Sequence, residues 1–406
     1  MPKQLLKWVY SSIVQEFFYS LPYGTGTANI SRENALVVRT DGLGDLILAI
    51  PILKHVKKAY GESRICLLTR TEWRDLFRGC PYIDDIIPLD VESYRRNIFY
   101  RLRFLKSLRK RSFGVAVHPA YSREPLSDEI LCCSRAEQKI GFDGDLNNIG
   151  LRQKTMNDRH YSRLVRDASF VCSEIEHNRH FTEQLLGESI DSRDFQPELW
   201  ITHTERAIAQ RLLRKNQLDP QRDVIVAVFP GASWEGKEWP PASYAKIAGR
   251  IVAQYGAKIV ICGNKTDLVA VDGVASRMGE RSVNLAGRVN LGELAAVFES
   301  CSLFIGNDTG PLHMAVAMGT PTLCIMGGGH FGRFYPYGDL GRHRTVYKQM
   351  DCFDCNWQCI YETTRCIGEI SVDDVWRETQ NMMEAVVLPA KERRITSLRD
   401  RVALPK

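Results

Sequence analysis

The stretch 303–326 constrains the fold of this chain most strongly. A short apolar run of strand type leads there into the turn and capping residues 306–310. Pro311 then stands where a helix can begin, because its missing N–H needs no partner at the first helical positions, and Gly319 ends that helix. Since a second apolar run follows at 322–326, the pattern predicts a strand, loop, helix and strand in succession, the unit from which parallel sheets are built.

The loop 306–310 has the features of an anion site. Backbone N–H groups have no partner at the start of a helix, and neighbouring glycines let a ligand come close. Asp308 would repel a pyrophosphate, so its carboxylate is better placed as a helix cap or as an acceptor for sugar hydroxyls. The alternative is that Asp308 and Thr309 only cap the helix, as any α/β protein requires.

A second unit of the same kind opens the first half of the chain. Apolar runs at 35–39 and 64–68 flank the glycine turn 41–45 and a helical pattern, which predicts two parallel strands joined by a helix. Pro51 falls inside the helical pattern and predicts a kink or a late helix start. The turn is similar to the fingerprint of NAD-binding proteins, but Ile47 occupies the place of its third glycine, which disfavours an NAD-dependent oxidoreductase.

Asp45 is the candidate general base. It lies near the carboxyl end of the first expected strand, where open α/β sheets bind their ligands. A carboxylate there can accept a proton from a substrate hydroxyl, or it can cap the following helix. The residues alone leave both roles open.

The second half of the chain repeats the alternation. Its loop 230–240 resembles a second anion cradle, in which Ser233 donates a hydroxyl and Lys237 brings a mobile positive charge to a phosphate. Strands that end in glycine-bearing loops build a nucleotide crevice. Strands are expected at 83–89, 115–118 and 139–142 in the first half and at 224–229, 258–262 and 282–285 in the second, with a helix at 291–300.

One helical pattern of the first half, 95–111, contains many Arg and Lys residues and no acid. Such a run is usually a solvated helix face, but the lack of balancing acids favours an anionic partner, with Arg101 and Arg103 as the candidate residues that bind it. A phosphorylated glycolipid or an acidic membrane surface fits better than nucleic acid, for which the sequence has no recognition motif.

Composition and the ends of the chain limit the remaining options. With 406 residues, 44% hydrophobic and 25% charged, the chain is long enough for two domains, and its net charge of +6 is only mildly basic. Twelve cysteines without a recognisable secretion signal indicate a reducing compartment, and no apolar run reaches the length of a membrane span. We therefore expect a cytoplasmic protein, with peripheral contact to the inner membrane left open.

Four segments are expected from this pattern. Residues 1–34 form an amphipathic extension, either an interfacial membrane helix or an arm that packs on the protein or on a second subunit. A first α/β domain with its linker covers 35–200, within which the polar residues 143–200 give little signal, and a second domain covers 223–385. The tail 388–406 is basic and is expected to be flexible.

Three ordered motifs carry a specific resemblance: VVRTDGLGDLILAIPIL, VFPGASWEGKEWPPASYAKIA and FIGNDTGPLHMAVAMGTPTLCIMG. In this order and spacing the chain resembles glycosyltransferase family 9, the heptosyltransferases of lipopolysaccharide core assembly, over about residues 35–385. The resemblance implies an α/β fold of the GT-B type, with two Rossmann-like parallel-sheet domains that face each other across a cleft. It further implies an acceptor on the first domain, ADP-heptose on the second, and inverting heptosyl transfer to a glycolipid at the inner membrane face.

The same resemblance assigns roles to the candidate residues. Asp45 matches the general base of the family, and Lys237 and Ser233 match groups that hold the donor phosphates. Inverting transfer needs a base behind the acceptor hydroxyl and positive charge at the departing diphosphate, which these groups can supply without a catalytic metal. The loop and helix that bind the pyrophosphate and the donor sugar are matched by Asp308, Thr309, Gly310 and His313.

A cluster of four cysteines lies in the segment CFDCNWQCIYETTRC, residues 352–366. Coordination of a structural zinc or iron by the thiolates would hold this loop, which is poor in core residues, in one conformation. Free surface thiols are the alternative. The protein-modifying branch of the family, which heptosylates autotransporter adhesins, carries a similar metal finger and assembles into rings, so an oligomer stays open. The candidate ligands are Cys352, Cys355, Cys359 and Cys366.

Other functions also stay open. A family member could act on a protein, or could use another nucleotide sugar. A non-catalytic nucleotide-sugar-binding protein is the further alternative, and Asp45 and Lys237 argue against it by being present.

Overall fold

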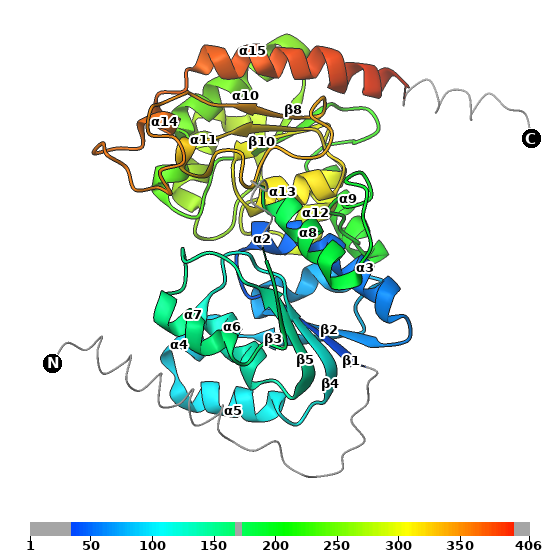
Figure 1. The fold of residues 1–406 in the computed structure, drawn as a ribbon. Coiled ribbons are helices and arrows are strands. Elements are labelled where there is room, and N and C mark those ends of the chain that lie inside the picture. Colours follow the sequence, from blue (N-terminus) through cyan, green and yellow to red (C-terminus); the bar gives the residue numbers. More distant parts are fainter. Residues whose placement is uncertain (1–33, 167–172, 394–406) are drawn as a thin grey trace, which may run out of the picture. The chain divides into compact units, whose positions relative to one another are not determined.

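The computed structural model describes residues 34–166 and 173–393, which divide into two compact units (Figure 1). The first unit holds the described chain up to Asp41 and the ranges 49–74 and 81–195. The second holds 42–48, 75–80 and the chain from Gln196 onward. The glycine turn and short helix that contain Asp45 therefore belong with the second unit, although the strand before them belongs to the first.

A six-stranded parallel sheet forms the centre of the first unit, in the order β3-β2-β1-β4-β5-β6. Its central strand is buried along its apolar residues because helices cover both faces of the sheet, as parallel sheets require. The strands are β1 (Asn34–Val38), β2 (Arg64–Arg70), β3 (Asp85–Leu89), β4 (Phe113–His118), β5 (Ala136–Phe142) and β6 (Arg163–Val165).

The helices of the first unit begin at residues suited to that place. Asp90 caps α4 by accepting a hydrogen bond from the N–H of Ser93 at 2.9 Å, and Asn97 caps α5 in the same way. Pro51 stands in the first turn of its helix, so the predicted late start is confirmed. The helices are α3 (Ile50–Tyr60), α4 (Val91–Arg96), α5 (Ile98–Leu108), α6 (Pro125–Cys133), α7 (Leu151–Asp158) and α8 (Glu174–Leu186).

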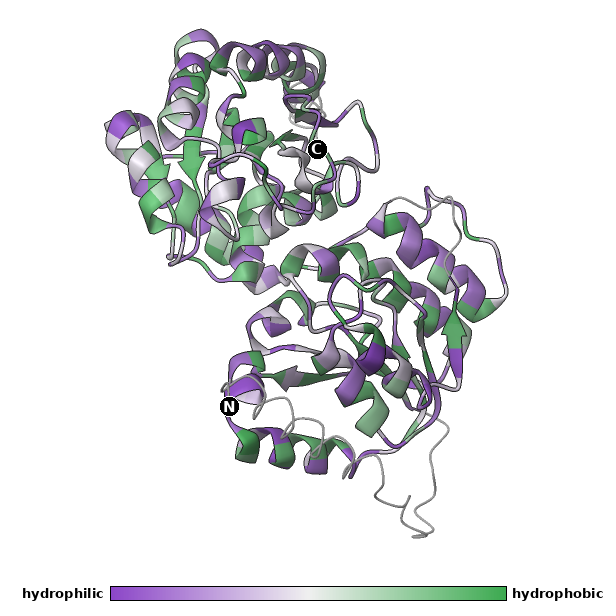
Figure 2. Cartoon of the chain, turned by 60° about the vertical axis from the view of Figure 1, so that its left-hand side comes forward, coloured by the Kyte–Doolittle hydropathy of each residue, from purple (hydrophilic) through white to green (hydrophobic). Residues whose placement is uncertain are grey.

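The second unit contains another six-stranded parallel sheet, in the order β12-β11-β10-β7-β8-β9. Figure 2 shows its strands coloured mainly as apolar, and its core includes the fully buried Trp239. The strands are β7 (Ile225–Phe229), β8 (Lys258–Ile261), β9 (Ser282–Asn284), β10 (Leu303–Asn307), β11 (Thr322–Ile325) and β12 (His343–Val346).

The helices of the second unit include the two that matter for the site, α2 (Leu43–Leu48) and α13 (Gly310–Ala317). Short 3-10 segments follow β7 and β11, at η2 (Glu235–Lys237) and η4 (Gly328–His330). Within the described ranges, no helix is both long and apolar enough to cross a bilayer. The remaining helices are α9 (His203–Lys215), α10 (Pro241–Tyr255), α11 (Leu268–Met278), α12 (Leu291–Glu299), α14 (Arg365–Gly368) and α15 (Val372–Met382).

The predicted strands are confirmed, with bounds that shift by a few residues. The sequence did not predict β6 and β12, because both are short and the second consists mainly of polar residues. It also did not predict α7 and α8 within 143–200. Of the predicted extension 1–34 only Asn34 is described, and it begins β1. Of the predicted tail 388–406 the structure describes 388–393, which are helical, and Lys391 Nζ donates to the carbonyl of Asp223 at 2.8 Å.

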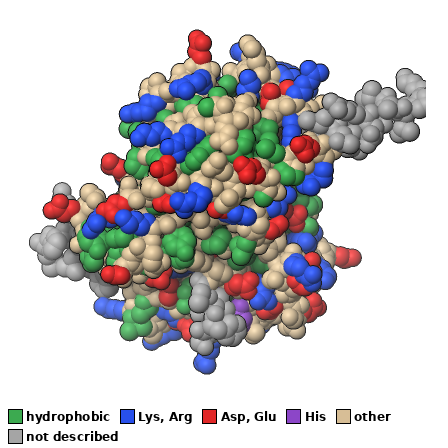
Figure 3. All heavy atoms as spheres, turned by 90° about the horizontal axis from the view of Figure 1, so that it is seen from above, with side chains coloured by type: hydrophobic (Ala, Val, Ile, Leu, Met, Phe, Trp, Pro, Cys, Tyr) green, Lys and Arg blue, Asp and Glu red, His purple; other side chains and the backbone are tan. Residues whose placement is uncertain are grey.

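The charge on the surface is mixed in sign where Figure 3 shows it. Lys and Arg side chains lie there among Asp and Glu side chains rather than in one continuous patch.

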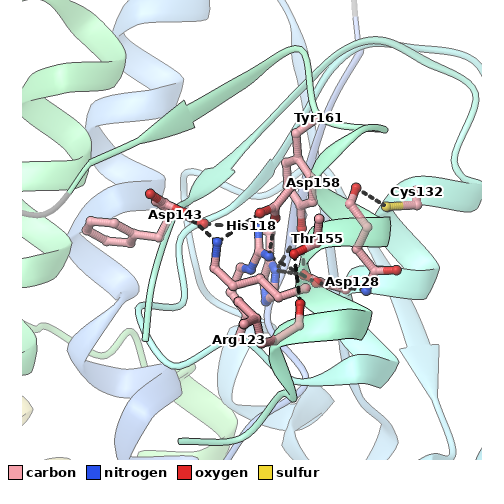
Figure 4. Close-up of polar contacts among 12 residues, drawn as sticks. His118, Arg123, Asp128, Cys132, Asp143, Thr155, Asp158 and Tyr161 are labelled. Carbon is pink, nitrogen blue, oxygen red and sulfur yellow. Dashed lines mark hydrogen bonds and ion pairs between the residues drawn. The ribbon is translucent and has the colours of Figure 1, made fainter. Parts of the chain in front are cut away.

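A buried polar network lies beside the end of β4 in the first unit (Figure 4). Its centre is the carboxylate of Asp128, which is fully buried and accepts hydrogen bonds from the Tyr161 hydroxyl at 2.6 Å and the Asn157 amide at 3.0 Å. Arg123 forms an ion pair with it at 3.5 Å, and His118 Nδ1 lies 3.4 Å from one of its oxygens. Because these groups are shielded from solvent, the network serves the stability of the unit.

Burial alone would raise the pKa of Asp128, but its hydrogen bond with His118 and the charges of His118 and Arg123 hold that pKa below its usual value of 3.8. The ionised carboxylate therefore contributes stability above the unfolded pKa, and this contribution is lost as the pH falls through the lower folded pKa.

We predict that Asp128→Asn lowers the free energy of unfolding by about 1–3 kcal/mol at neutral pH, because Arg123 loses one of its two carboxylate partners and keeps the other, Asp158. Between about pH 5 and pH 3 the variant should lose less stability than the wild type. Urea unfolding followed by circular dichroism measures both effects. Asp85→Asn, which removes the exposed ion pair with Arg111, is the matched control and should cost less than about 1 kcal/mol. Equal losses in the two variants would contradict the role of the network.

Candidate active site

The loop between β10 and α13 places an acidic side chain against a histidine. One Asp308 carboxylate oxygen lies 3.7 Å from His313 Nε2, and the two side chains are 11% and 3% exposed. His313 Nδ1 lies 3.1 Å from the Tyr337 hydroxyl, and the two rings are stacked. Both contacts are satisfied when Nε2–H points to Asp308 and Nδ1 accepts from Tyr337.

The charges around Asp308 keep it ionised. Burial raises the pKa of this carboxyl, but its interactions with His313, Lys237 and His330 lower it further than burial raises it. An ionised carboxylate accepts hydrogen bonds and does not donate them, so Asp308 suits the hydroxyl groups of a sugar.

The start of α13 is open to a ligand. Thr309 occupies the N-cap position in an extended conformation, and in the part of the chain described here no side chain caps the helix. The Thr309 hydroxyl faces the Asn307 carbonyl at 3.4 Å instead. Asp308 and Thr309 therefore do not cap the helix with their side chains. Pro311 has no N–H and the Leu312 N–H donates to the Thr309 carbonyl at 3.0 Å, so Gly310 is the residue of the first turn whose N–H can serve an anion.

Lys237 lies in η2, on the loop that follows β7, and is half-buried. Its ammonium is near enough to Asp308 to lower the pKa of that carboxyl, and it lies 4.8 Å from the ring centre of Trp357. Ser233 is exposed on the same loop. The structure thus brings Asp308, His313 and Lys237 together, as the motifs predict, with Ser233 close by in the chain.

A residue to which the sequence assigned no role, Asn307, holds the two loops together. Its fully buried side-chain oxygen accepts hydrogen bonds from the backbone N–H of Trp239 at 3.1 Å and from the Tyr244 hydroxyl at 2.9 Å. Its amide nitrogen donates to the Pro230 carbonyl at 2.8 Å. The signal that could have found it is an asparagine at the end of a buried strand, where an uncharged amide can serve two loops at once.

The helix that carries Asp45 packs on α13 within the second unit (Figure 1). Glycines permit this approach, because a Cβ on Gly44 would lie 2.9 Å from the His313 ring and a Cβ on Gly310 would lie 2.8 Å from Leu43. Asp45 is the third residue of α2, so it lies inside the first turn and not at the N-cap. At this position the Asp45 carboxylate can still act as a general base. Its helix packs on α13, the helix that follows the loop with Asp308.

The two candidate acceptor residues lie in α5 of the first unit. Arg101 pairs with the buried Glu129 at 2.5 Å and is 15% exposed, whereas Arg103 is exposed. Glu129 therefore already engages Arg101, and Arg103 is the better placed of the two to meet a ligand. Acceptor binding by either residue stays a prediction.

The four cysteines of the segment 352–366, which we call the cysteine loop, lie near one another. Burial raises the pKa of the Cys359 thiol, and the charges of the other three thiols raise it further. Cys366 Sγ also accepts a hydrogen bond from the Gly328 N–H at 3.4 Å. Thiolates suit zinc or iron, but no group of three or more metal-binding side chains in the described chain is arranged to hold an ion. The metal site stays a prediction.

Two six-stranded parallel sheets, each in its own unit, form an α/β fold of the GT-B type. A family model, glycosyltransferase family 9 (heptosyltransferase), matches residues 101–361, and this chain belongs to that family. Lipooligosaccharide heptosyltransferase 2 of Haemophilus influenzae is 22% identical over 299 residues, 72% of this chain and 83% of that protein.

Solved structures share the fold. A family 9 glycosyltransferase of Veillonella parvula has a TM-score of 0.75 at 20% identity and covers 87% of this chain and 98% of its own. The ADP-heptose lipopolysaccharide heptosyltransferase II of Escherichia coli has a TM-score of 0.67 at 18% identity, with 88% and 99% covered. The iron-containing dodecameric heptosyltransferase TibC has a TM-score of 0.51 at 13% identity, with 87% and 77% covered.

We predict that Asn307→Asp lowers the free energy of unfolding by about 1–3 kcal/mol, because the Pro230 carbonyl loses its buried donor. Chemical unfolding followed by tryptophan fluorescence measures the change. Asn264→Asp is the matched control, since its side-chain oxygen accepts from the Thr266 N–H and aspartate keeps that bond. A loss no larger than that of the control would show that Asn307 does not hold the loops.

Proposed function

We propose that this protein transfers heptose from ADP-heptose to a lipopolysaccharide core acceptor with inversion at the anomeric carbon. The observation that carries the proposal is the convergence of Asp308, His313 and Lys237 at the uncapped start of α13, with the Asp45 helix packed against it. A carboxylate, a cation and free amide groups at one helix start are what a sugar diphosphate needs.

In the proposed reaction, Asp45 accepts the proton of the acceptor hydroxyl as its oxygen attacks the anomeric carbon of the donor. The bond from that carbon to the phosphate oxygen breaks, and ADP leaves with the bonding electrons. Attack from the face opposite to the leaving group inverts the anomeric centre, through an oxocarbenium-like transition state.

The charge on the departing diphosphate is offset by the Lys237 ammonium and by the N–H groups of Thr309 and Gly310. Ser233 donates its hydroxyl to a donor phosphate. Asp308 accepts hydrogen bonds from the donor sugar, and His313 keeps this carboxylate ionised and oriented. None of these steps requires a metal ion.

The donor and acceptor classes are supported by what the relatives are called. The Escherichia coli enzyme is named for ADP-heptose and lipopolysaccharide, and the Haemophilus influenzae relative for lipooligosaccharide. The acceptor would then be an anionic glycolipid at the inner membrane face, with Arg103 as the better placed basic contact and a cytoplasmic location for the enzyme.

A protein acceptor is the second candidate, and the cysteine loop favours it. TibC, which shares the fold, is an iron-containing dodecamer in complex with ADP-D-β-D-heptose. Under this second candidate function the protein forms an oligomer. It also binds a structural zinc or iron through four thiolates, those of Cys352, Cys355, Cys359 and Cys366. The metal would staple the loop and take no part in the transfer.

We predict that wild-type protein binds ADP-heptose in calorimetry and binds UDP-glucose and GDP-mannose far more weakly. Lys237→Ala should weaken ADP-heptose binding by about ten- to a hundredfold, because a charge-assisted contact to phosphate is lost. Lys246→Ala, on the exposed face of α10, is the control and should bind as the wild type does. Binding of none of the three sugars by the wild type would refute the donor assignment.

We predict that Asp45→Asn retains donor binding and loses transfer by about 10²- to 10⁴-fold, because the amide cannot accept the hydroxyl proton. Release of ADP in the presence of a core glycolipid measures transfer, and calorimetry measures binding. Turnover at the wild-type rate would remove Asp45 from the role of base.

A further inference from the structure

Trp357 lies in the cysteine loop, which is distant in the chain from the loops 230–240 and 306–310. Its ring nevertheless lies close to Lys237 of the loop 230–240. The Lys237 ammonium is 4.8 Å from the centre of this ring, within cation–π distance. The indole N–H donates to His330 Nδ1 at 3.3 Å. The ring is therefore oriented at one end by His330 and offers its face to Lys237.

The backbone fixes the place of the cysteine loop against the turn after β11. The Asp354 N–H donates to the Gly328 carbonyl at 2.8 Å, and the Asn356 N–H donates to the Gly329 carbonyl at 3.0 Å. A Cβ on Gly329 would lie 2.4 Å from the Trp357 ring. Because a side chain at Gly329 would displace the ring, this glycine is needed for the contact.

His330 connects the same two segments. Its Nε2 bonds the Asn356 side-chain oxygen while its Nδ1 accepts from Trp357, so both ring nitrogens are engaged by the cysteine loop. This arrangement requires the neutral tautomer with the proton on Nε2. His330 thus positions Trp357.

The contact with Trp357 restricts the Lys237 side chain before a ligand binds. A lysine side chain has several rotatable bonds and loses conformational entropy when a ligand orders it. The neighbouring Asp308 carboxylate attracts the same ammonium and could draw it away from a phosphate. A ring that holds the ammonium in advance reduces both costs, which is how preorganisation raises affinity.

We propose that Trp357 is a positioning residue for Lys237, so that the cysteine loop forms part of the nucleotide-sugar site. This inference rests on the proposed function, since it takes Lys237 to contact the donor diphosphate. It adds a residue outside the three motifs and gives the cysteine loop a direct link to donor binding.

The test compares Trp357→Phe, which keeps an aromatic face, with Trp357→Leu, which removes it. Leucine is used because it leaves a smaller void than alanine would. ADP affinity is measured by calorimetry on the full chain, in the wild-type and Lys237→Met backgrounds. Trp357→Leu should weaken ADP binding on the order of tenfold, and Trp357→Phe by less. In the Lys237→Met background, Trp357→Leu should add no further loss.

Trp376→Leu is the matched control, because Trp376 forms a comparable pair with Arg250, 5.8 Å from its ring centre, on a helix that does not carry the site. It should leave ADP affinity unchanged. Additive losses in the double variant, or equal affinities of Trp357→Leu and wild type, would overturn the inference and leave the proposed function standing. Failure of the wild type to bind ADP would instead overturn the proposed function and, with it, this inference.

Discussion

The candidate site of this protein depends on one buried amide, the side chain of Asn307. Its oxygen receives two donors from the segment that begins α10, and its nitrogen bonds the carbonyl of Pro230. The loop with Lys237 and the loop with Asp308 are thereby held at fixed separation. A charged side chain could not satisfy donors and an acceptor together without water, whereas an amide does so at little desolvation cost.

Close backbone approach is the second constraint on the site. Gly44 and Gly310 let α2 reach α13, and Gly329 lets the cysteine loop bring Trp357 to Lys237. Each contact joins segments distant in the chain, and each would be displaced by a single methyl group. The arrangement collects an acid, a histidine, a lysine and an aromatic ring around one helix start, where the helix dipole favours a negatively charged ligand.

The sequence predicted the fold well where local signals are strong. Long apolar runs bounded by glycine gave the central strands, and Pro51 marked a late helix start because its ring restricts the chain itself. The edge strand β12 gave no signal, since its polar residues are ordered by pairing with β11. In the candidate site too, local motifs identified some residues and tertiary contacts identified others. The motifs gave Asp308, His313 and Lys237. The contacts of Asn307 and Trp357 with distant segments became visible only in the structure.

The sequence by itself determined the class of architecture, the family resemblance and the residue types available for the chemistry, because these depend on local periodicity, turn residues and ordered motifs. Tertiary structure alone decided that Asp45 lies inside a helix turn grouped with the second unit, that Glu129 engages Arg101, and that the cysteine loop reaches Lys237. Those facts are distances between segments far apart in the chain, and no local pattern encodes such distances.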